Sequence, residues 1–333
     1  MQQTSQINWL SILRGMTIML VVAYHTHIIN AATGKDYQYI LDTGVFFSPL
    51  RMPTFVMISG ALLYHTRIKK EIQVIDLYKD KLIRLALPLF FCTCIANIIQ
   101  IAFSDILRNS NTVTLSSFLL SFVEYDHSPW VHRWYLMVLM LLMSIYPLYR
   151  YVLKSDIMIC ITLICLLCLW SVDFTQYVET NWLKLFSINK YLPFFFLGIV
   201  IFKYELWHYM AKWYYSIFFW IVYVIIYSCG YGNMIIESLI GILAMMTTAI
   251  QMDKVVPTIF SSFRKYIFQI YLFGMVIQGF IDNVIWTKIG QPDNLSFCFY
   301  VFTILCAVYI PVIISKLVEK IPVNYIRLSF GLK

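Results

Sequence analysis

Long apolar runs recur along the whole chain and are separated by short polar segments. Runs of roughly 20 apolar residues match a membrane-spanning helix rather than the short alternating strands of a barrel. Windows of about 19 residues predict ten spans: 9–29, 44–64, 82–103, 134–153, 157–173, 190–202, 214–231, 233–252, 266–286 and 295–317. The pattern therefore predicts an all-α, polytopic integral membrane protein with about ten transmembrane helices and a single domain over residues 1–333.

Composition agrees with that class, because 60% of the residues are hydrophobic and only 13% are charged, with a mean hydropathy of +0.74. The net charge of +8 fits basic cytoplasmic loops better than a nucleic-acid partner. With the N-terminus inside, the cytoplasmic segments hold sixteen Lys and Arg residues and the outer segments six, namely Lys35, Arg108, Arg133, Lys184, Lys190 and Lys288. This bias predicts that both termini are cytoplasmic.

All eight cysteines lie in apolar runs, without the paired polar ligands of a zinc site or the loop framework of disulfides. We expect them to be buried small apolar side chains, and we expect no metal. The N-terminus lacks a basic region of the signal-peptide kind, so the first helix is expected to remain in the mature protein.

The first span contains two ionisable residues, Arg14 and His25. Such groups are costly in hydrocarbon and usually face a protein interior or a wet cavity. They are eleven residues apart, so on a helix they lie within about 20° of one face and about 16 Å apart along the axis. Arg14 could instead extend to the headgroups, and His25 could make an ordinary core hydrogen bond. The functional interpretation of His25 is a general base.

The second and third spans add further basic residues. Arg51 lies roughly two turns below the outer surface, near the depth expected for His25, and Pro53 can kink that span. Lys81 and Arg84 are three residues apart at the cytoplasmic start of the third span, where they share a helix face and could clamp a phosphate. The alternative is an ordinary basic segment that touches anionic lipid.

Aromatic and ionisable side chains are mixed just before the fourth span, in a segment that includes His132, Trp134 and Tyr135. Aromatic faces beside polar donors suit a sugar-binding platform. An interfacial belt explains the Trp and Tyr residues equally well.

Taken together, these segments resemble acyltransferase family 3, the bacterial integral-membrane acyltransferases that include surface-polysaccharide O-acetyltransferases. The strings that carry the resemblance are "SILRGMTIMLVVAYH", "RMPTFVMISGALL", "DKLIRLALPLF", "HRWYLMVLMLLMSIYPL" and "YLPFFFLGIVIF", in the family's order along the chain. In one departure, "IYLFGMVI" places Phe273 and Gly274 where many members carry a late histidine, which concentrates the catalytic hypothesis on His25.

The resemblance implies about ten helices, an acyl-CoA donor on the cytoplasmic side, usually acetyl-CoA, and a carbohydrate hydroxyl as acceptor. In this interpretation His25 deprotonates the hydroxyl or briefly accepts the acyl group. Arg14 holds the pantetheine or polarises the thioester, and Lys81 and Arg84 hold the CoA phosphates. Arg51, with His132, Trp134 and Tyr135, is assigned to the acceptor.

The expected partners are acyl-CoA, a surface glycan or lipid-linked sugar, and membrane lipids, and the expected location is the bacterial plasma (inner) membrane. The sequence leaves open whether the protein forms a homo-oligomer. Two other functions also stay open: an exporter or flippase of a glycan or lipid-linked precursor, and a sensor that binds acyl-CoA without turnover.

Overall fold

The computed structural model describes residues 7–26, 38–102, 114–124, 133–178, 182–230 and 234–332, with the backbone alone at 38–43 and 82. Regular structure in these ranges is helical, apart from one antiparallel bridge between Glu124 and Trp182. The all-α class is therefore confirmed for the described part of the chain.

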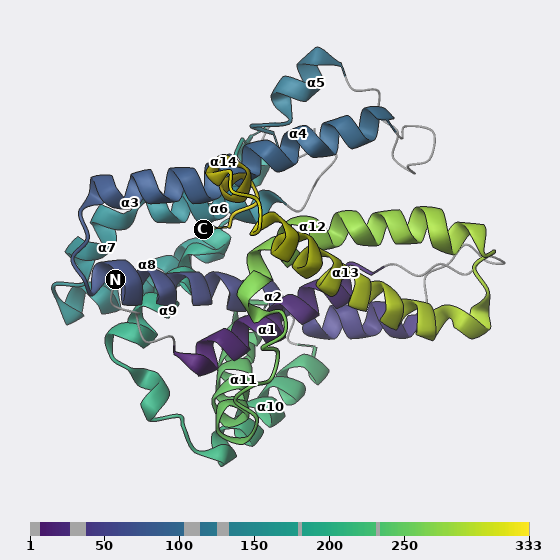
Figure 1. Cartoon of the computed structure of the whole chain (residues 1–333). Coiled ribbons are helices and arrows are strands. Elements are labelled where there is room, and N and C mark those ends of the chain that lie inside the picture. Colours follow the sequence, from purple (N-terminus) through teal and green to yellow (C-terminus); the bar gives the residue numbers. More distant parts are fainter. Residues whose placement is uncertain are drawn as a thin grey trace. The chain divides into compact units, whose positions relative to one another are not determined.

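Fourteen α-helices lie in the described ranges (Figure 1). Their bounds are α1 Asn8–Tyr24, α2 Gln38–Leu63, α3 Val74–Lys81, α4 Leu87–Ala102, α5 Leu115–Leu120, α6 Trp134–Ser144, α7 Tyr146–Val152, α8 Asp156–Trp170, α9 Leu192–Lys203, α10 Trp213–Ser228, α11 Met234–Val255, α12 Ile267–Phe280, α13 Ser296–Val318 and α14 Asn324–Ser329. Three π-helical segments continue longer helices: η1 Tyr64–Ile68, η2 Leu82–Ala86 and η8 Ile281–Trp286. Short 3₁₀ turns are η4 Phe174–Tyr177, η5 Leu185–Lys190, η6 Leu206–His208, η7 Arg264–Tyr266 and η9 Asp293–Leu295.

In the described residues each predicted span falls on an apolar helix, except that 134–153 falls on the bent pair α6 and α7. Five continuous helices in the described residues are long and apolar enough to cross a membrane: Gly44–Ile68, Val74–Ala102, Met234–Val255, Arg264–Trp286 and Asp293–Val318. The bent pair α6 and α7, which meet at 51°, makes a sixth if it is one span. The other four, α1, α8, α9 and α10, are apolar but shorter. A helical membrane protein is thus supported, whereas the count of ten and the cytoplasmic termini stay predictions.

The chain forms two compact units, and the single-domain expectation stays a prediction. The first unit comprises Met1–Ile58 and Ile201–Ile314. In it α1 packs against α11 and α12, and α10 lies beside α11 (Figure 1). Close approach depends on glycine, since a Cβ at Gly274 would lie 3.0 Å from the Ala307 carbonyl oxygen of α13. This packing surrounds α1, the helix that carries Arg14 and leads to His25.

The second unit comprises Ser59–Val200 and Ser315–Lys333. Here the end of α2 lies directly on α9, because a Cβ at Gly60 would collide with the carbonyl oxygen of Phe195. Tyr146, at the start of α7, donates a 2.8 Å hydrogen bond to the Ile72 carbonyl, which ties the segment before α3 to this bundle. These contacts set the place of α3 and η2, which carry Lys81 and Arg84.

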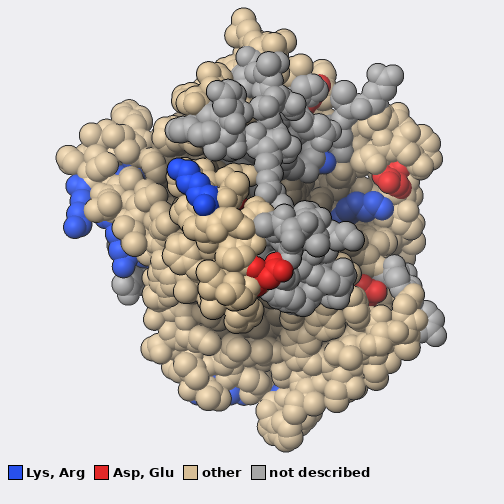
Figure 2. Space-filling model, turned by 90° about the vertical axis from the view of Figure 1, so that its right-hand side faces the viewer, with Lys and Arg blue, Asp and Glu red and all other residues tan. Residues whose placement is uncertain are grey.

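Apolar side chains cover much of the surface. Phe90, Ile157 and Phe297 are 57%, 72% and 64% exposed, and uncharged residues predominate among the coloured atoms of the face in Figure 2. The cysteine expectation was wrong for most of the eight, all of which are free thiols: Cys92 is buried, but Cys160, Cys165, Cys168, Cys229 and Cys298 are exposed. The physical reason is that a helix facing hydrocarbon need not bury an apolar side chain.

Candidate active site

Arg14 lies in the second turn of α1 and is partly buried. The glycine that follows it has a packing role, because a Cβ at Gly15 would lie 2.8 Å from Cδ2 of Phe260. Phe260 itself has a φ of +62°, a backbone conformation that costs a non-glycine residue on the order of 1–3 kcal/mol. Gly15 therefore lets a loop residue with a strained backbone pack closely on α1, one position after Arg14.

His25 is the C-cap of α1, whose last helical residue is Tyr24. The prediction of a helix to residue 29 was wrong for the described part, since the helical conformation stops at Tyr24 and Thr26 no longer belongs to it. The imidazole is partly buried and meets the Tyr24 ring edge-on, with centroids 4.9 Å apart and an interplanar angle of 81°. His25 therefore sits at a helix end rather than in the middle of an apolar span.

Arg51, on α2, is brought beside this helix end. Its guanidinium carbon lies 3.3 Å from the centroid of the Tyr24 ring, and Nη2 donates a 3.1 Å hydrogen bond to Ser48 Oγ. Arg51 is 5% exposed, so its charge is largely removed from water and is balanced in part by the aromatic face. Gly44 leaves room for the tyrosine, since a Cβ there would lie 2.9 Å from Tyr24 Cδ2.

Three predicted residues thus belong to the same unit, but they are not equivalent. Arg51 and His25 both contact the Tyr24 ring, whereas Arg14 is about 16 Å from His25 along the axis by helix geometry. The sequence reasoning assigned no role to Tyr24. Its only signal in the sequence is its position immediately before His25.

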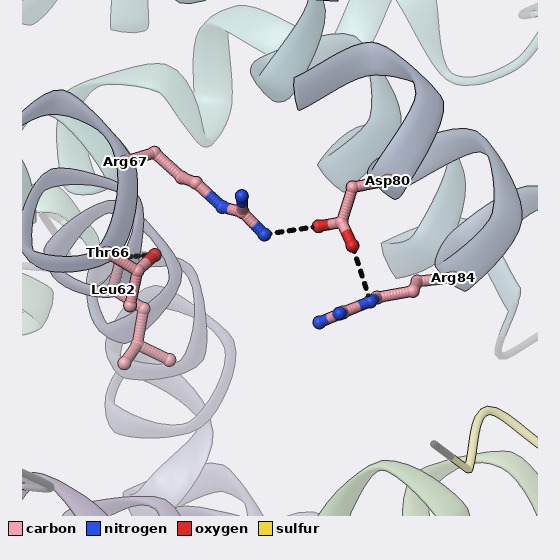
Figure 3. Close-up of polar contacts among 5 residues, drawn as sticks. All are labelled: Leu62, Thr66, Arg67, Asp80 and Arg84. Atoms are coloured by element: carbon pink, nitrogen blue, oxygen red, sulfur yellow. Dashed lines mark hydrogen bonds and ion pairs between the residues drawn. The ribbon is translucent and has the colours of Figure 1, made fainter. Parts of the chain in front are cut away.

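The second unit contains a compact cluster of charge around Asp80. Arg67 of η1 donates to Asp80 Oδ2 at 2.6 Å, and Arg84 of η2 places Nε 2.7 Å from Oδ1 (Figure 3). The Arg84 side chain is 42% exposed and the Asp80 side chain 19%. Lys81 follows Asp80 directly and is partly buried. The sequence pattern indicates Lys81 and Arg84 but assigns no site role to Arg67 or Asp80, because only folding brings η1 against α3.

Each guanidinium reaches Asp80 through one nitrogen, while a guanidinium carries five N–H donors. The two arginines, less the charge of Asp80, leave a net charge of +1 on the three residues in contact. Such a group suits a phosphate, and the carboxylate holds both guanidinium groups in place before any anion arrives.

The two described residues of the predicted sugar-binding platform, Trp134 and Tyr135, lie in the second unit. Tyr135 is 5% exposed, and its hydroxyl is 2.7 Å from Ser59 Oγ. Trp134 is partly buried and lies against Tyr191, with ring centroids 4.9 Å apart. His132 lies outside the described residues. The described geometry favours a packing role for Tyr135, and the sugar-platform hypothesis stays a prediction.

The described residues form apolar helices, with ionisable groups at the end of α1 in one unit and a basic cluster in the other. These features are those of a helical integral membrane protein. The chain belongs to acyltransferase family 3: the family model, described as an acyltransferase domain, matches residues 7–316, nearly the whole chain. It is accordingly a membrane acyltransferase. Neither a curated protein nor a solved structure matches it.

Proposed function

We propose that this membrane acyltransferase moves an acetyl group from acetyl-CoA to a hydroxyl of a surface glycan or lipid-linked sugar in the bacterial plasma membrane. Family membership supports the acyl transfer. The observation that carries the site assignment is the group at the end of α1, where His25 meets Tyr24 edge-on and Tyr24 carries the buried charge of Arg51 on its face. A base and a buried cation thus both contact the same aromatic ring.

His25 is assigned the role of general base. Its imidazole takes the proton of the acceptor hydroxyl while the hydroxyl oxygen attacks the carbonyl carbon of the thioester. The tetrahedral intermediate then collapses with cleavage of the carbon–sulfur bond, which leaves the acetyl group as an ester on the acceptor. The CoA thiolate receives the proton from the imidazolium, so His25 returns to its neutral form.

The two arginines of this unit receive different roles on grounds of distance. Arg14, about 16 Å from His25 along α1, suits an extended part of the donor such as the pantetheine arm. Arg51 lies much closer to His25 through Tyr24, where a fixed, buried positive charge stabilises a developing oxyanion or orients the acceptor.

The CoA phosphates are assigned to the basic cluster of Arg67, Lys81 and Arg84. Its support is chemical: two guanidinium groups share Asp80, and both side chains retain solvent exposure that a water-soluble donor needs. Arg67 is added to the two residues that the sequence indicated.

The test is label transfer by the purified protein in liposomes, with radiolabelled acetyl-CoA and candidate glycans. We expect labelled acceptor from the wild type and none from His25→Ala. The matched control is His208→Ala, because His208 is an exposed histidine on η6 whose imidazole lies 3.6 Å from Glu205. Turnover by His25→Ala equal to that of the control would refute the assignment, and translocation of unmodified glycan without label transfer would favour an exporter.

A further inference from the structure

At the end of α1 a buried backbone carbonyl has no hydrogen-bond donor within the helix. In a continuing helix the Thr26 amide would bond to the Val22 carbonyl, but here it donates to Ala23 at 3.3 Å. The Val22 carbonyl therefore loses its helical partner at the point where the chain reaches His25. A buried carbonyl in this position requires another donor.

Gln278 of α12 supplies that donor. Its Nε2 donates to the Val22 carbonyl at 2.8 Å and to Thr26 Oγ1 at 2.6 Å. Gln278 is 1% exposed and Thr26 is fully buried. The orientation of the amide is determined by chemistry, because the Val22 carbonyl can only accept and must face the NH₂ group.

Two more side chains complete the arrangement. The Thr26 hydroxyl donates to the same Val22 carbonyl at 3.1 Å. Tyr300 of α13 donates from its hydroxyl to the Ala23 carbonyl at 3.2 Å. Residues on both sides of His25 are thus bound to helices distant in the sequence.

We infer that Gln278 is a positioning residue that holds the end of α1, and with it the imidazole of His25, in the orientation needed for proton transfer. The inference rests on the proposed role of His25. Because Gln278 bonds to the backbone at Val22 and to the side chain of Thr26, it acts through the helix end and contacts no reacting atom. A displacement of a catalytic group by about 1 Å can cost on the order of 100-fold in rate.

The chain offers a matched control for this contact. Asn189, in the other unit, is also a buried amide, and its Nδ2 donates to the Leu169 and Val172 carbonyls, each at 2.7 Å, at the end of α8. In the described residues the amide oxygens of Gln278 and Asn189 are both buried without a hydrogen-bond partner. The two amides therefore perform the same structural task, but only Gln278 performs it beside His25.

The experiment compares Gln278→Met with Asn189→Leu, since both replacements keep the approximate volume and remove the donors. We expect Gln278→Met to lower kcat about 10- to 100-fold with the KM for acetyl-CoA changed less than about twofold, whereas Asn189→Leu keeps kcat within about twofold. Hydrogen exchange of the peptide containing residues 22–26 should accelerate in Gln278→Met alone. This readout needs no activity and distinguishes a released helix end from general destabilisation.

The outcomes separate the inference from the proposed function. If His25→Ala abolishes transfer while Gln278→Met retains wild-type kcat, the positioning role is overturned. If His25→Ala retains transfer, the role of His25 has failed instead, and exchange at residues 22–26 alone reports whether Gln278 holds the helix end. Should Gln278→Met not fold, Thr26→Val removes the second acceptor of Gln278 with an isosteric side chain and is expected to show the same fall in kcat.

Discussion

The stacking of Arg51 on Tyr24 predicts a measurable coupling between two residues on different helices. The guanidinium carbon is 3.3 Å from the ring centroid, and Arg51 is 5% exposed, whereas Tyr24 is 40% exposed. Cation–π contacts contribute about 0.5–1 kcal/mol at exposed sites and about 2 kcal/mol when desolvated. Because Arg51 is buried and Tyr24 is partly exposed to solvent, we expect a coupling free energy of about 1.5 kcal/mol.

The perturbation is a double-mutant cycle with Tyr24→Leu and Arg51→Met. Tyr24→Leu removes the aromatic face and leaves a buried charge without it, so the single variant should lose about 2 kcal/mol of unfolding free energy. Tyr24→Phe keeps the aromatic face and removes only the contact between the Tyr24 hydroxyl and Arg51, so this variant should lose less than about 1 kcal/mol. Arg51→Met removes the charge, so Tyr24→Leu should cost about 1.5 kcal/mol less in that background.

The free energies are measured by equilibrium unfolding in mixed micelles, and turnover is measured with acetyl-CoA on the same samples. We expect kcat to fall in Tyr24→Leu, which also removes the edge contact to His25, and to be largely retained in Tyr24→Phe. A coupling below about 0.3 kcal/mol, within the usual error of additivity, would refute the stacking argument. Equal losses in Tyr24→Phe and Tyr24→Leu would refute it as well.

Two further predictions concern the other unit. Arg84→Gln should raise the KM for acetyl-CoA about tenfold with kcat unchanged, because it removes a charge-assisted hydrogen bond to phosphate of about 1.4 kcal/mol. Initial rates at varied donor concentration test this prediction, and an unchanged KM would contradict the phosphate assignment. Gly60→Ala should lower the unfolding free energy by about 2 kcal/mol, since its Cβ meets the backbone of Phe195 and α2 must move away from α9. Gly279→Ala is the control, because a Cβ there has no neighbour within 4 Å, and equal unfolding midpoints for the two variants would exclude the collision.

Several elements followed from local pattern alone. In the described residues each predicted span coincides with an apolar helix or, for 134–153, with the bent pair α6 and α7, because hydrocarbon requires a satisfied backbone over roughly 20 residues whatever the neighbouring helices do. Helix ends were less predictable. Apolar residues continue beyond His25, but the helix ends there, where side chains from α12 and α13 bind the last carbonyls.

In the candidate site, too, some residues were predictable from the local sequence and others were not. Arg14, His25, Arg51, Lys81 and Arg84 were recognisable because a charge in or beside an apolar run stands out from its neighbours. Their partners were not recognisable, since Tyr24 and Gln278 are ordinary polar residues of apolar helices. Apart from the position of Tyr24 immediately before His25, nothing in their local sequence distinguishes them from residues that only pack.

The sequence by itself determined that this chain is a helical membrane acyltransferase and where its ionisable groups lie along the helices, because hydrophobic length and family motifs are local properties. Only the tertiary structure decided which groups meet: Arg51 with Tyr24 across α2 and α1, Arg67 with Arg84 through Asp80, and Gln278 with the carbonyl of Val22. These contacts join residues up to 256 positions apart. Helix packing sets such distances, and a pattern of apolar and polar residues records only which face is buried.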